Sequence, residues 1–78
     1  MKFIEESFFF PLEVPRSVAE MIAKEVGERC SADAQTSVRA GTAGWFINIK
    51  ARTIRESNKA KIYPFLYGVE FALRRSLL

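Results

Sequence analysis

Histidine is absent from this 78-residue chain, and cysteine occurs once, at Cys30. The chain therefore lacks the commonest general base, the catalytic triads that use it, and the imidazole ligands of many metal sites. A single thiol can form neither an intramolecular disulfide nor a four-thiolate zinc site. We expect a protein that is not an enzyme and that holds no metal and no cofactor.

The acidic residues and the single thiol are also poor candidates for catalytic groups. Glu5 and Glu6 are neighbours, but on a strand they point to opposite faces and cannot form a pair. Cys30 lies at the expected end of a helix, where the helix dipole disfavours a thiolate, so we interpret it as a buried structural thiol. A site built from carboxylates that the fold brings together is the alternative that would make the chain an enzyme.

Long apolar runs are also missing. The richest segment, residues 63–73, is interrupted by Glu70 and is too short to span a bilayer. Near the N-terminus, acidic residues follow Lys2 closely and the run Phe8–Phe10 stops at Pro11, unlike a signal peptide. We expect a cytoplasmic protein with no membrane partner.

Ten aromatic residues provide much of the material for a core. A length of 78 residues suits a single domain, which we place at residues 1–78. A core of this size is marginal, so tight packing or self-association would help to stabilise it.

The first half of the chain predicts a strand followed by a helix. Residues 2–10 are rich in aromatic and branched side chains and end at Pro11, and at least one of three consecutive phenylalanines must point away from the core. The helix is expected to begin at Ser17, because Ser17 and Glu20 match a capping box. It should end between Val26 and Cys30, with Gly27 either at that end or as a weak point one turn before it.

A β-hairpin follows, with strands at 36–40 and 45–54. Gly41-Thr42-Ala43-Gly44 joins them, and although this GxxG outline resembles the clamp of some RNA-binding loops, we interpret it as a hairpin turn. The second strand alternates clearly. Its expected core face contains Trp45, Ile47, Ile49 and Ala51, and its other face contains Phe46, Asn48, Lys50 and Arg52.

The last element is a helix, expected at residues 63–76. Pro64 leaves two interpretations, a helix that starts close to it or a longer helix kinked at it. The predicted fold class is therefore α+β with the order β-α-β-β-α. We expect a three-stranded sheet that contains an antiparallel hairpin, with two helices packed on one face.

Charge is distributed unevenly along the chain. Residues 1–38 contain four basic and seven acidic residues, whereas residues 39–78 contain eight basic and two acidic ones. Such asymmetry is typical of a basic patch that meets an acidic partner. The candidate binding residues are the cations of the hairpin and the following segment together with one aromatic: Arg39, Phe46, Lys50, Arg52, Arg55, Lys59 and Lys61.

Two functions fit this patch. Cations beside an aromatic ring can neutralise phosphates while a base stacks, which favours nucleic acid as the partner. The alternative is a protein-interaction module, such as a small inhibitor or adaptor of the kind that phages and mobile elements often encode, docked on an acidic protein surface. The surplus of aromatic residues also predicts a homodimer. The interpretation that assigns no function to the patch is an ordinary solvated sheet face.

Overall fold

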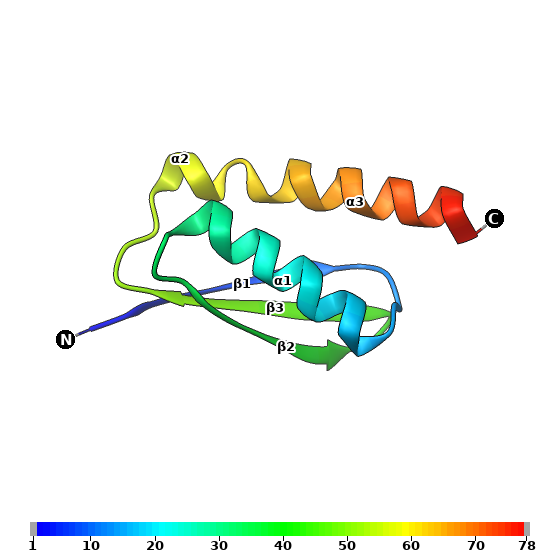
Figure 1. Cartoon of the computed structure of the whole chain (residues 1–78), viewed down its shortest axis with the longest axis horizontal. Coiled ribbons are helices and arrows are strands. Elements are labelled where there is room, and N and C mark those ends of the chain that lie inside the picture. The colour runs from blue at the N-terminus through cyan, green and yellow to red at the C-terminus, as the bar shows by residue number, and fades with distance from the viewer. Residues whose placement is uncertain (1, 78) are drawn as a thin grey trace.

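The computed structural model describes residues 2–77, and the side chains of residues 2–76 (Figure 1). The predicted α+β class and element order are confirmed, with one short additional helix. The elements are β1 (Ile4–Phe10), α1 (Arg16–Cys30), β2 (Gln35–Gly41), β3 (Gly44–Ala51), α2 (Glu56–Lys59) and α3 (Ile62–Leu77).

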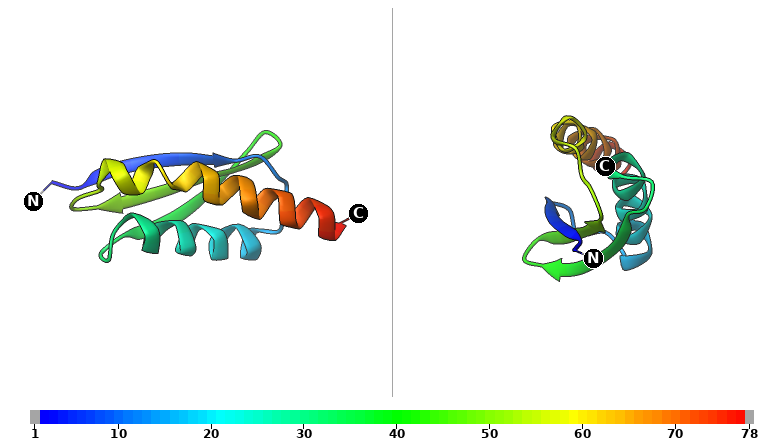
Figure 2. Two further views of the ribbon diagram at one scale, coloured as in Figure 1. Left: turned by 90° about the horizontal axis from the view of Figure 1, so that it is seen from above. Right: turned by 90° about the vertical axis from the view of Figure 1, so that its left-hand side faces the viewer.

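The sheet has the strand order β1-β3-β2, and both neighbours of β3 are antiparallel to it. The register is continuous, from Ile4 opposite Ala51 to Phe10 opposite Trp45 on one side of β3. All helices lie on the same face of the sheet, with α1 over the β2 side and α3 over the β1 side (Figures 1 and 2). Within residues 2–77, the other face of the sheet carries no helix (Figure 2).

The core lies between the sheet and the helices. On β3, Ile47, Ile49 and Ala51 are at most 1% exposed, which confirms the predicted alternation. Other core side chains come from β1, α1 and α3, among them Phe8, Phe10, Ile22, Val26, Ile62 and Leu66. Burial of these apolar groups is the main force that holds the helices on this face.

Trp45 is only half-buried, because it lies at the end of the sheet. Its indole Nε1 donates a hydrogen bond of 2.9 Å to the carbonyl oxygen of Val14. This bond fixes the β1–α1 connector against β3.

Strand β3 ends at Ala51, three residues before the predicted end. Its last partners are Ile4 on β1 and, through Lys50, Gln35 on β2, so no strand remains beyond them to pair with. Ile54 instead turns back and is buried against the core.

The predicted capping box at Ser17 is wrong. Helix α1 begins at Arg16, and the carbonyl oxygen of Pro15 accepts hydrogen bonds of 3.0 Å from the N–H groups of Val18 and Ala19. Ser17 therefore lies inside the first turn, where it cannot cap the free amides. Pro15, with φ −57°, sets the entry into the helix instead.

Pro64 lies in the first turn of α3, which confirms the interpretation that the helix starts close to it. An N–H in the first turn has no partner within the helix, so proline costs little there. The preceding residues form the separate α2, which the sequence did not predict as its own helix. Asn58 of α2 donates a hydrogen bond of 3.2 Å to the Cys30 carbonyl oxygen at the end of α1.

Gly27 lies one turn before the end of α1, where the second interpretation placed it. It is buried where α1 crosses β2, and a Cβ on it would meet the Thr36 methyl group. The glycine lets the helix approach the sheet closely. Gly68 of α3, in contrast, has open space around the position of a Cβ.

These two helical glycines predict opposite effects of the same substitution. Gly68→Ala should raise the free energy of unfolding by about 0.5–1 kcal/mol, because alanine favours the helix and meets no neighbour. Gly27→Ala should lower it by about 1 kcal/mol or more, because overpacking against Thr36 exceeds the helix gain. Urea denaturation of the two variants and the parent checks both signs, and a stabilising Gly27→Ala would contradict the close packing.

Candidate binding face

The face of the sheet opposite the helices, called here the open face, consists of three cross-strand rows. Strand alternation and the register place these rows about 7 Å apart along the strands. The rows are Phe9–Phe46–Arg39, Ser7–Asn48–Ser37 and Glu5–Lys50–Gln35, each read from β1 through β3 to β2. The open face therefore presents an aromatic row, a polar row and a charged row.

The aromatic row is held by ring packing. The Phe9 and Phe46 rings lie 5.0 Å apart between centroids, tilted by 52°. The Arg39 guanidinium lies over the Phe46 ring at 4.5 Å, a distance at which a cation is attracted to the ring face. Gly41 leaves room for this ring, because a Cβ there would lie 2.7 Å from Phe46. Three groups from three strands thus form one platform.

The hairpin turn next to the platform confirms the interpretation of the GxxG outline. Gly41 pairs with Gly44, and Thr42 and Ala43 make the turn. Neither glycine has a positive φ, whereas Ala43 does, at 62°. Gly44 is required for space, because a Cβ there would meet the Phe10 carbonyl and the Phe9 ring.

The polar row is linked across two strands. The Ser7 hydroxyl donates a hydrogen bond of 3.0 Å to the Asn48 side-chain oxygen. Beside it, a hollow of about 340 Å³ is lined by polar groups of the second and third rows, among them Gln35, Ser37, Asn48 and Lys50. This volume lies at the lower end of small-molecule sites, which suits one polar group of a larger ligand.

Lys50 of the charged row has two neighbours from β1 and its N-terminal extension. Its Nζ lies 4.0 Å from Glu5 Oε1 and 5.1 Å from the centre of the Phe3 ring. The Lys50 and Glu5 side chains are 47% and 74% exposed. An ion pair this long and this exposed is worth little, so the Lys50 ammonium stays accessible to a stronger anion.

Arg52 lies just beyond β3, beside the α1–β2 loop. Its Nε is 3.9 Å from Asp33 Oδ2, and its backbone N–H donates a hydrogen bond of 3.2 Å to the same oxygen. Hydrogen bonds from the Ser31 hydroxyl and the Arg52 backbone, together with the Arg52 charge, lower the pKa of Asp33. Asp33 therefore holds the α1–β2 loop against the end of β3 and partly neutralises the charge of Arg52.

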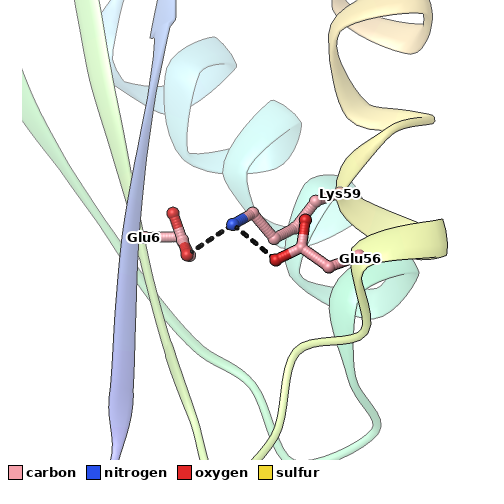
Figure 3. Close-up of polar contacts among 3 residues, drawn as sticks. All are labelled: Glu6, Glu56 and Lys59. Atoms are coloured by element: carbon pink, nitrogen blue, oxygen red, sulfur yellow. Dashed lines mark hydrogen bonds and ion pairs between the residues drawn. The ribbon is translucent and has the colours of Figure 1, made fainter.

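The structure does not bring the remaining three predicted cations to the open face. Arg55, Lys59 and Lys61 belong to α2 and its flanks, in the helical layer. Lys59 reaches the helix side of β1, where its Nζ lies 2.8 Å from Glu6 Oε1 and 3.3 Å from Glu56 Oε1 (Figure 3). The hydrogen bond to Glu6, followed by the pair with Glu56, raises the pKa of Lys59.

Of the seven candidate residues, Arg39, Phe46 and Lys50 share the open face, and Arg52 borders it. Sequence analysis missed the contribution of β1 to the face, namely Glu5, Ser7 and Phe9. The signal for Phe9 was present, because one of the three consecutive phenylalanines had to point away from the core. The opposite directions predicted for Glu5 and Glu6 are confirmed by their separate partners, Lys50 and Lys59.

Cys30 is buried at the end of α1, as predicted. Burial is the main cause that raises the pKa of its thiol; the charge of Glu6 adds to this and that of Lys59 opposes it. A thiol with a raised pKa is a poor nucleophile at neutral pH.

The Glu6–Lys59 contact predicts a specific loss of stability in alkali. Because the folded state raises the pKa of Lys59, the contact contributes fully below the ordinary lysine pKa and is lost as pH rises through the folded value. As the pH rises above the ordinary lysine pKa of about 10.4, the melting temperature of the parent should therefore fall more steeply than that of Lys59→Met. Thermal melts followed by circular dichroism check this, with Lys24→Met as the control, and parallel curves for parent and Lys59→Met would contradict it.

Comparison with known proteins assigns neither a family nor a function to this chain. No protein-family model, no curated protein and no solved structure matches the chain.

Proposed function

We propose that this chain is a non-enzymatic binding protein whose open face binds an acidic ligand, with single-stranded nucleic acid as the favoured ligand. The supporting observation is the platform in which Arg39 lies over Phe46 beside Phe9, on a sheet face without a helix. A base stacks on such a platform, and guanidinium planes stack on bases as rings do.

Lys50 supplies the phosphate contact. It lies two rows from the platform, about 14 Å along the strands, which is a span that an extended strand of a few nucleotides bridges. The polar row and its hollow lie between them and offer amide and hydroxyl groups to a base edge. A rigid duplex presents its bases inside the stack, so the platform favours a single strand.

Binding rather than catalysis is proposed for two reasons. The chain has no histidine, and its one thiol is buried with a raised pKa. The open face presents cations, rings, amides, hydroxyls and one exposed carboxylate, that of Glu5, a set that suits recognition of a ligand.

A second candidate is a protein-interaction module, such as a small inhibitor or adaptor, in which the same face docks on an acidic protein surface. The modest charge of the face supports it, because the rows contain two cations and also the carboxylate of Glu5. A stoichiometric protein partner recovered after nuclease treatment would favour this candidate over nucleic acid.

Fluorescence anisotropy with labelled single-stranded and duplex oligonucleotides tests the first candidate. Lys50→Gln and Arg39→Gln should each weaken single-strand binding and reduce the slope of log affinity against log salt by about 0.7. Phe46→Leu should weaken binding about tenfold by removing a stacking surface. Lys24→Gln, the same charge change on α1, should leave affinity unchanged, and the absence of binding by the parent at low salt would refute nucleic acid as the ligand.

Glu5 predicts an effect of the opposite sign. Glu5→Gln removes the carboxylate that competes for Lys50, so affinity for a single strand should rise several-fold at about 50 mM salt and less at about 200 mM. Glu28→Gln on the exposed side of α1 changes the net charge equally and serves as the control. Equal gains in both variants would show that only net charge matters and that Lys50 is not a contact.

A further inference from the structure

The outer edge of β1 has no strand beside it within residues 2–77. Each residue from Ile4 to Phe10 pairs one to one with β3, so β1 is regular and free of bulges. It contains no proline and no lysine, which proteins often use to block such edges. Its two charged residues point to opposite faces of the sheet, Glu5 toward Lys50 and Glu6 toward Lys59.

Exposed apolar side chains lie at the start of β1 and on α3, the helix that contacts β1. Phe3 and Ile4 lie at the start of β1, and the rings of Tyr63 on α3 and of Phe8 form an edge-to-face pair with centroids 5.5 Å apart. Tyr67 continues the stripe at 6.1 Å from Tyr63, and Phe71 follows one turn later. These residues, other than the buried Phe8, are 41–63% exposed, and among the described side chains only one further large hydrophobic residue, Met21, is exposed.

The other edge of the sheet differs. Strand β2 has the sequence QTSVRAG, and most of its residues are polar or small. The hollow beside it, about 650 Å³ between α1 and β2, combines Arg16, Glu20 and Lys24 with Met21. This mixed rim does not favour one kind of occupant, whereas among the described side chains five of the six exposed large hydrophobic residues belong to β1, its N-terminal extension and α3.

We propose that a second copy of this chain pairs antiparallel along the outer edge of β1, which makes the protein a two-fold symmetric dimer with a six-stranded sheet. Pairing about Ser7 places Glu5 of one copy opposite Phe9 of the other, and Glu6 opposite Phe8. No two carboxylates then face each other directly, and like faces of the two sheets continue across the junction.

The surface area fits such a dimer. The five exposed side chains present roughly 500 Å² per copy, taking about 200 Å² for a fully exposed aromatic. With the backbone edge of seven residues added, the two copies reach roughly the 1,200 Å² at which stable interfaces begin. A two-fold arrangement satisfies both edges at once and is the commonest symmetry among soluble oligomers.

The dimer does not rest on the proposed function, and the two fail independently. Nucleic-acid binding is measured on the open face, whereas the dimer is measured without any ligand. Pairing would nevertheless join two open faces into one surface and double the number of its cations.

Sedimentation velocity over a range of protein concentrations tests the dimer. The parent should sediment with twice the monomer mass, and Ile4→Lys and Tyr67→Glu should each raise the dimer dissociation constant at least tenfold. Both positions are exposed, so circular dichroism should show an unchanged fold, and Met21→Lys is the matched control that should remain dimeric. A parent that stays monomeric at the highest concentration, or a dimer that only Met21→Lys disrupts, overturns the proposal.

Discussion

The central position of β3 is the constraint on which the rest of the molecule depends. Because β3 pairs on both sides, the direction of every side chain on the sheet follows from its alternation. Ile47, Ile49 and Ala51 are buried under the helices, so Phe46, Asn48 and Lys50 must lie on the open face. Slippage of β3 by one residue would reverse both sets and expose the core, which fixes the register strongly. The core and the candidate binding face are therefore two consequences of one pattern.

In the folded chain, acidic residues lie close to several cations of the basic second half. Glu5 and Asp33, both from the acidic half, lie beside Lys50 and Arg52. The long distances and exposed positions of these pairs leave the cations free to exchange partners. Lys59 differs, because two short contacts hold it against Glu6 and Glu56, and there the charge serves the packing of α2 on β1 (Figure 3). The cations of the basic half thus have two roles in the fold. Lys50 and Arg52 form a small accessible patch, and Lys59 forms ion pairs between α2 and β1.

Local sequence patterns were sufficient to predict most of the helices and strands. Alternation in residues 45–51 and the apolar stripe after Pro64 gave the correct elements, because burial enforces both periods. The start of α1 was mispredicted because Ser17 and Glu20 match a capping signal, whereas the helix begins one residue earlier, at Arg16, and has no side-chain cap. For the site, β3 and Arg39 were predicted, but the partners from β1 depend on a pairing between residues about forty positions apart. The position of Lys59 beside β1 was not predicted for the same reason. No local sequence signal shows that the chain after β3 folds over the helix side of the sheet.

An NMR titration tests the central claim most directly. Backbone amide shifts of the isotope-labelled chain would be followed while a short single-stranded oligothymidine is added at low salt. The account predicts that the saturable shifts concentrate on the three rows of the open face, around Arg39, Phe46 and Lys50, while the α1 surface around Lys24 stays unchanged. Shifts confined to the helical layer, or none at saturating oligonucleotide, would contradict it.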